Sequence, residues 1–153
     1  MRLITRSGLV PKPPEKIWAW LCDLKNLDAL YDCLGLRRSG CRHVLEGSGP
    51  IKAGSKIVLL APSGKPYVTW TVIDCVPNAA LTLVASREGF IDGLHMQWSF
   101  ELEGLEGSRT NAKVGFGLVF HRSALEIFSF NPLVTFLYGW SVGRMLWMLK
   151  SNW

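Results

Sequence analysis

Short alternating runs of apolar and polar residues fill the middle of the chain and predict an antiparallel sheet. Between residues 37 and 120 these runs are separated by Gly, Pro, Asn or Asp, as in a meander of hairpins. One more run precedes residues 11–14, where prolines deny hydrogen-bond donors to a sheet. We therefore predict seven strands, at Leu3–Val10, Arg42–Glu46, Ser55–Ala61, Tyr67–Val76, Ala80–Ser86, Leu94–Leu105 and Arg109–Phe120.

Alternation within these runs assigns side chains to the two faces of the sheet. Side chains two residues apart share a face, and a row of large apolar side chains belongs in the core. In the run that starts at Leu94, this rule places His95 on the face opposite the core. Within each run, one set of side chains shares a face. These sets are Met96, Trp98, Phe100 and Leu102 in the run from Leu94, Val68, Trp70 and Val72 in the run from Tyr67, and Ala112, Val114, Phe116, Leu118 and Phe120 in the run from Arg109.

Helical spacing of apolar residues occurs near the start of the chain and again at its end. We predict a broken pair of short helices at Glu15–Leu21 and Asp23–Leu30, and one long helix at Leu133–Lys150. Asn131 and Pro132 precede the long helix, and both residue types are favoured where a helix begins.

The long helix carries two apolar stripes, which imply contacts on two sides. We therefore expect it to cross the concave face of a curved sheet and to leave a cavity between them. Gly139 and Gly143 each cost about 0.8–1.0 kcal/mol relative to Ala inside a helix, so close approach to the sheet or room for a ligand should offset them. One stripe contains Leu133, Leu137, Trp140, Arg144 and Trp147, and the other Val134, Ser141, Met145 and Met148.

Several short motifs resemble those of a known superfamily. The segment Val10–Trp18 resembles a helix entry with a small residue or Pro followed by Glu-x-(Val/Ile)-(Trp/Phe), and Asp23 occupies the place of a following Asp. Gly54 before a strand, Trp70–Pro77 and Trp98–Leu102 resemble strand motifs of the same group. Together with the order of elements, they resemble the helix-grip fold of the START-like superfamily, also called SRPBCC, which includes polyketide cyclases and lipid-transfer proteins.

This resemblance covers nearly the whole chain and implies a fold more specifically than a chemistry. It implies one START-like domain over residues 1–153, of the α+β class, with a seven-stranded curved antiparallel sheet, two short helices and one long C-terminal helix. Superfamily members often have Trp and Pro after the first helices, whereas here the segment Leu27–Asp32 has only Tyr31 near that position. A single fold of this kind hosts carriers, receptors and enzymes, so function depends on the site.

An internal cavity between the sheet and the long helix is what the resemblance implies, and apolar walls with a few polar groups are usual for small-molecule sites. Aromatic residues at these spacings serve equally well as core filling. The candidate ligand-binding residues are Trp70, Trp98, Phe116, Phe120, Tyr138, Met145 and Tyr31.

Candidates for acid–base catalysis are His95, His121 and Tyr138, because His transfers protons near neutral pH and a Tyr hydroxyl can orient a carbonyl. The third histidine, His43, lies in a basic segment that we expect to be solvated. Arg144 is expected to reach the surface from its stripe. The sequence shows no nucleophile elbow, phosphate-binding Gly loop or zinc motif, so we expect no metal and no cofactor.

Composition and charge limit the classes of partner and the compartment that we expect for the protein. The chain has 17 basic and 12 acidic residues and a net charge of +5, but it lacks a basic stripe with interleaved aromatics, so we expect no nucleic-acid binding. The first nine residues lack an apolar signal segment, which favours the cytoplasm. The four cysteines have no CxxC spacing, and we expect buried or half-buried free thiols.

Three functions follow from these observations. The first is binding of a hydrophobic or aromatic small molecule, of the lipid, quinone or polyketide class, in the internal cavity. The second is a cyclase or aromatase activity in the same cavity. The third is docking of the apolar C-terminal helix on a membrane surface or on a protein partner, including a second copy in a homodimer.

Overall fold

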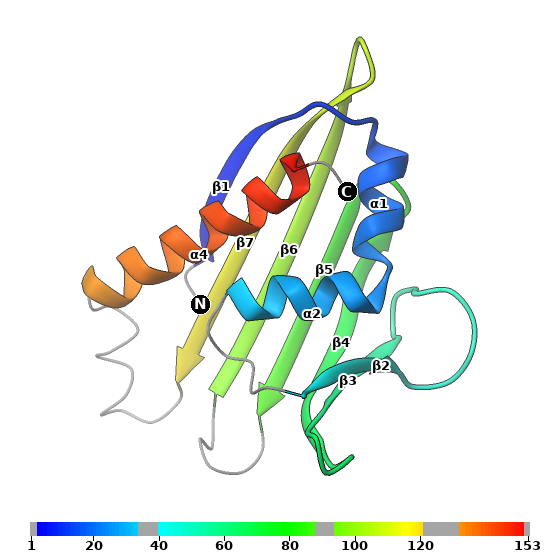
Figure 1. Cartoon of the computed structure of the whole chain (residues 1–153), viewed down its shortest axis with the longest axis vertical. Helices are drawn as coiled ribbons and strands as arrows, with labels where there is room; N and C mark the ends of the chain where they lie inside the picture. Colours follow the sequence, from blue (N-terminus) through cyan, green and yellow to red (C-terminus); the bar gives the residue numbers. More distant parts are fainter. Residues whose placement is uncertain (1–2, 34–39, 88–93, 121–131, 152–153) are drawn as a thin grey trace.

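The structure, a computed structural model, describes residues 3–33, 40–87, 94–120 and 132–151. Its helices are α1 (Pro14–Leu21), α2 (Leu24–Cys33) and α4 (Pro132–Lys150), as Figure 1 shows. Its strands are β1 (Leu3–Val10), β2 (Arg42–Leu45), β3 (Lys56–Leu60), β4 (Pro66–Val76), β5 (Ala80–Arg87), β6 (Leu94–Leu105) and β7 (Arg109–Phe120).

All seven strands form one antiparallel sheet, in the order β1-β7-β6-β5-β4-β3-β2. The first strand pairs with the last, from Leu3 opposite Gly117 to Val10 opposite Thr110. The helices α2 and α4 lie on the same face of this sheet, and α1 lies near one end of it (Figure 1). The predicted fold class, α+β with a seven-stranded sheet, two short helices and a long C-terminal helix, is confirmed.

The core lies between that face of the sheet and the helices. Trp70 and Trp98 are completely buried, and Phe100 and Phe116 are nearly so, as the alternation predicted. Burial of each such side chain stabilises the fold by about 1.5–3 kcal/mol, so a shift of the strand register by one residue would be costly. The register of β4 against β5 does shift between Val72 and Asp74, at a bulge.

Helix α4 has one covered and one exposed apolar stripe, which corrects the expectation of contacts on two sides. Its buried side chains face β1, β7 and α2, the elements with which α4 is in contact. These are Ser141, Val142, Met145, Leu146 and Leu149, whereas Phe136, Leu137, Trp140 and Trp147 are exposed.

The two glycines of α4 have different surroundings. A Cβ on Gly139 would come within 3.1 Å of the Arg6 guanidinium, so this glycine allows β1 to approach closely. A Cβ on Gly143 would meet no atom within 4 Å. Close approach to the sheet therefore accounts for Gly139, whereas the space beside Gly143 belongs to a surface groove lined by Trp140 and Trp147.

The C-terminal end of α4 is tied to the segment that follows β1. The Lys12 ammonium donates hydrogen bonds to the carbonyl oxygens of Leu149, at 3.3 Å, and of Ser151. The carbonyl of Lys12 in turn accepts a 2.7 Å hydrogen bond from the Thr110 hydroxyl on β7. A cation at the last turn also complements the helix dipole, so this contact fixes where α4 crosses the sheet.

Candidate ligand-binding site

Two tryptophans stack at the centre of the covered face of the sheet. The ring centroids of Trp70 on β4 and Trp98 on β6 are 4.7 Å apart, and the two ring planes are inclined by only 8° to each other. They meet across β5, where Ala85 pairs with Trp70 and presents only a methyl group. An offset stack of this kind adds about 0.5–1.5 kcal/mol beyond the area that it buries.

An aromatic cluster extends from this stack to both helices. Tyr31 of α2 lies edge-on to Trp70 at 6.1 Å and to Trp98 at 5.8 Å. Toward α4, the ring centroid of Phe116 lies 6.5 Å from that of Trp98 and 5.3 Å from that of Tyr138. The cluster therefore connects α2 to α4 across the middle of the sheet. Five of the seven predicted ligand-binding residues belong to it, namely Tyr31, Trp70, Trp98, Phe116 and Tyr138.

The polar atoms of this cluster distinguish it from ordinary core packing. The indole nitrogens of Trp70 and Trp98 are buried and have no hydrogen-bond partner among the described residues. A buried donor without a partner costs about 1–3 kcal/mol, and buried polar groups are usually satisfied by protein, water or ligand. An acceptor that reached either donor, such as a carbonyl oxygen, would be stabilised there.

Tyr138 supplies a hydroxyl at the α4 end of the cluster. Its side chain is half-buried, and burial raises the pKa of the phenol above its usual value. The hydroxyl therefore remains protonated around neutral pH and can donate a hydrogen bond.

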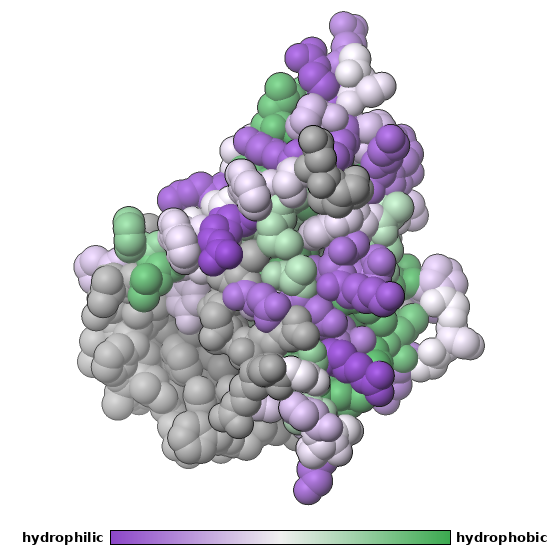
Figure 2. Space-filling model, viewed as in Figure 1, coloured by the Kyte–Doolittle hydropathy of each residue, from purple (hydrophilic) through white to green (hydrophobic). Residues whose placement is uncertain are grey.

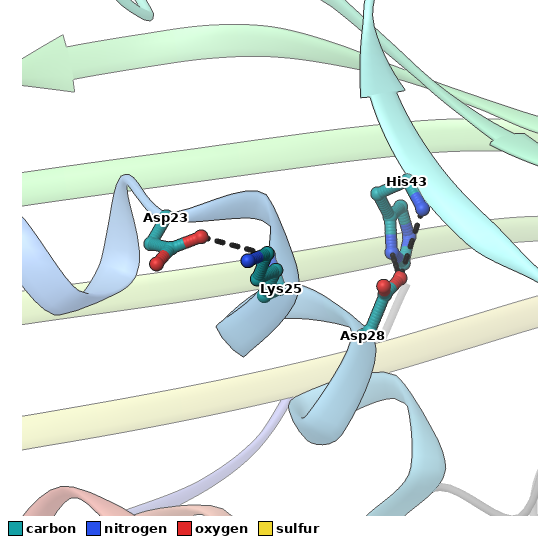
Figure 3. Close-up of polar contacts among 4 residues, drawn as sticks. All are labelled: Asp23, Lys25, Asp28 and His43. Atoms are coloured by element: carbon teal, nitrogen blue, oxygen red, sulfur yellow. Dashed lines mark hydrogen bonds and ion pairs between the residues drawn. The ribbon is translucent and has the colours of Figure 1, made fainter. Parts of the chain in front are cut away.

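A histidine that the sequence analysis placed in solvent is buried beside this cluster. The ring Nδ1 of His43 on β2 lies 2.6 Å from an Oδ of Asp28 on α2, and the same oxygen accepts a 2.8 Å bond from the backbone N–H of His43 (Figure 3). The His43 ring is 5.5 Å from Tyr31 and nearly perpendicular to it. Because the carboxylate accepts a hydrogen bond at Nδ1, that nitrogen carries a proton.

The remaining candidates have other positions. His95 is half-buried and lies on the face of β6 opposite Met96 and Trp98, away from the cluster, as its alternation predicted. Met145 is fully buried on the sheet side of α4. His121 lies outside the described residues, as does the side chain of Phe120, whose backbone ends β7. Within the described ranges, no group of three His, Cys, Asp or Glu residues could hold a metal ion.

Among the described cysteines, the structure confirms free thiols that are buried or half-buried. Cys41 is buried, and Cys22 and Cys75 are half-buried. Burial and, to a smaller extent, the neighbouring Cys75 raise the pKa of Cys22 to about 11. Because the thiolate is the nucleophile, this environment is the opposite of the one that activates a catalytic cysteine.

We predict from this pKa that Cys22 reacts slowly with alkylating reagents. A pKa of about 11, against a usual value of 9.0, leaves about 100-fold less thiolate at pH 8. Iodoacetamide labelling of the folded protein followed by peptide mapping would measure the rate at Cys22, and the same measurement in urea provides the control. A rate at pH 8 equal in both conditions would contradict the prediction.

Comparison with known proteins identifies the fold. No protein-family model and no curated protein matches the sequence. Among solved structures, protein CV1439 from Chromobacterium violaceum is 14% identical with a TM-score of 0.58, over 98% of each chain. Ara h 8.0201 is 13% identical with a TM-score of 0.54, over 95% of this chain and 97% of that one. DynU16, from the dynemicin biosynthetic locus, is 16% identical with a TM-score of 0.57, over 97% of this chain and 47% of its own.

The chain has the helix-grip fold. At these identities the likeness concerns the fold alone, and it agrees with the observed sheet and helices. In this helix-grip fold the side chains of the aromatic cluster occupy the space between the sheet and the helices α2 and α4, where the sequence analysis expected a cavity.

Proposed function

We propose that the protein binds a hydrophobic or aromatic small molecule, of the lipid, quinone or polyketide class, at the aromatic cluster between the sheet and helices α2 and α4. The observation that carries the proposal is the pair of buried indole N–H groups of Trp70 and Trp98, which lack partners among the described residues. A ligand with a carbonyl or comparable acceptor would satisfy them, and its apolar body would contact the rings.

The fold supports the same function. DynU16 has a similar fold and comes from a biosynthetic locus, which agrees with a role in binding a natural product of low polarity. The cluster consists of rigid rings and has few charged neighbours, so binding would depend on shape and on a small number of hydrogen bonds.

The test uses two ligands that differ only in their acceptors. We predict that 2-methyl-1,4-naphthoquinone binds at one site per chain and more tightly than 2-methylnaphthalene. Trp98→Phe and Trp70→Phe each remove one donor, so each should weaken quinone binding about tenfold and leave naphthalene binding nearly unchanged. Isothermal titration calorimetry measures both, and Trp140→Phe is the matched control because Trp140 is exposed.

Native mass spectrometry of protein purified from its own host completes the test. A co-purified molecule of low polarity that is lost in Trp98→Phe would support the proposal. If neither probe binds and no small molecule co-purifies, the proposal is wrong.

A cyclase- or aromatase-type activity is the second candidate, and the His43–Asp28 pair is the observation that favours it. The carboxylate holds Nδ1, and the contact with Tyr31 joins the ring to the aromatic cluster. A His held in this way can accept and return a proton. His43→Gln should then abolish turnover of a poly-β-carbonyl substrate without abolishing its binding, whereas a pure carrier shows no turnover in the wild type.

A further inference from the structure

The exposed stripe of α4 has no role in the small-molecule site. Its large apolar side chains are strongly exposed, at 69% for Phe136, 59% for Trp140 and 66% for Trp147. Together with Leu137 they follow one side of the helix, opposite the buried Val142, Met145 and Leu149. We call the exposed set, Phe136, Leu137, Trp140 and Trp147, the α4 stripe. Such a cluster on the surface usually marks a binding face.

Two arginines lie beside the stripe. The Arg144 guanidinium carbon is 5.0 Å from the centre of the Trp140 ring, and Arg6 reaches the helix from β1 beside Gly139. These residues line a surface groove of about 410 Å³ together with Phe136, Gly143 and Trp147. In Figure 2, hydrophobic side chains gather at the left end of α4, and hydrophilic ones follow along the helix.

The charged residues that line the groove beside the stripe, Arg6 and Arg144, are both basic. The elements α4, β1 and β7 contain Arg6, Arg109, Lys113, Arg144 and Lys150 and no acidic residue. Lys113 is paired with Glu101 of β6, but no ion pair involving Arg6 or Arg144 is found among the described residues. The groove therefore combines indole rings with two cations.

We infer that the α4 stripe docks on the surface of an anionic lipid bilayer. Trp side chains favour the interface between headgroups and acyl chains, and arginines beside them bind lipid phosphates. A helix that lies in the plane of the interface inserts one apolar side and keeps its cations at headgroup level. None of the helices among the described residues is long and apolar enough to cross a membrane.

Charge favours the bilayer over a second copy of the chain. A symmetric dimer through the stripe would place Arg6 and Arg144 near the same arginines of the partner. No acidic residue of α4, β1 or β7 would be available to compensate them, and like charges in contact oppose association. An anionic bilayer supplies the missing negative charge.

Vesicle flotation with the full chain tests the inference. We expect the wild type to float with vesicles of phosphatidylcholine and phosphatidylglycerol, to float weakly with phosphatidylcholine alone, and to dissociate as salt is added. Arg6→Gln and Arg144→Gln should each reduce partitioning about fivefold. Trp140→Ser combined with Trp147→Ser should reduce it about tenfold or more.

The matched control is Ile73→Ser combined with Val76→Ser, because both side chains are about half exposed on β4, at 55% and 48%. This control should float like the wild type. Absence of flotation with anionic vesicles at low salt, or an equal loss in the control, would overturn the inference. A dimer in light scattering that disappears in the double Trp variant would assign the stripe to a second copy instead and would also overturn it. The quinone titration above involves none of these residues except the control Trp140, so the two proposals fail independently.

Discussion

Trp98→Ala should lower the free energy of unfolding by about 3–5 kcal/mol. Trp98 is completely buried, stacks on Trp70 and lies edge-on or tilted against Tyr31, Phe100 and Phe116. Truncation removes the contacts of all four rings and leaves a cavity that rigid strands on either side cannot close. Urea unfolding followed by circular dichroism would measure the loss.

Trp140→Ala is the matched control for this substitution. The same side chain is lost at an exposed position of α4, so the change should be within about 0.5 kcal/mol. A cost below about 1 kcal/mol for Trp98→Ala would mean that the cluster does not hold the helices on the sheet.

Trp98→Phe separates this structural role from the proposed binding role. Phe retains most of the ring contacts and removes the N–H group, which has no partner among the described residues. Because that donor contributes no described hydrogen bond in the free protein, its removal should destabilise the fold much less than Trp98→Ala. A variant that folds well but binds the quinone weakly would identify the donor as part of a binding site.

The sheet was predictable because its signals are local. Turn residues separate the strands, and alternation places Trp70, Trp98 and Phe116 on one face whatever their partners are. The pairing of β1 with β7 joins the first strand to the last, and no local signal in Leu3–Val10 determines it. The sequence analysis therefore predicted the number of strands and not their order in the sheet.

The sequence pattern predicted helix α4 but not which side of it packs on the sheet. Two apolar stripes were recognised, and the sequence does not say which of them the sheet covers, because both have bulky residues at helical spacing. The position of α4 depends on contacts with distant residues, including Arg6 beside Gly139 and Lys12 at the last turn. The prediction that Arg144 reaches the surface was correct.

His43 was missed because Arg37, Arg38 and Arg42 near it suggested a solvated segment. A signal was available, since alternation from Cys41 places His43 on the same side, and both are buried. Its hydrogen-bond partner, Asp28, could not be predicted from the sequence. Asp28 lies on α2, and its approach to β2 depends on how that helix packs on the sheet.

Asp28→Ala should destabilise the protein by about 2–4 kcal/mol. One oxygen of Asp28 accepts bonds from both the backbone N–H and the ring Nδ1 of His43, whose side chain is completely buried. Removal of the carboxylate leaves two buried donors without this acceptor, and each loses its hydrogen bond without gaining access to water. Urea unfolding measures the loss.

Asp23→Ala is the control within the same helix pair. Asp23 lies immediately before α2 and accepts a 3.0 Å bond from the backbone N–H of Lys25 at an exposed position, so its loss should cost about 1 kcal/mol (Figure 3). In the His43→Ala background only the backbone bond to Asp28 remains, and Asp28→Ala should then cost about half as much as in the wild type. An equal cost in both backgrounds would show that the carboxylate acts on the backbone alone, and His43 would lose its place as an oriented base beside the aromatic cluster.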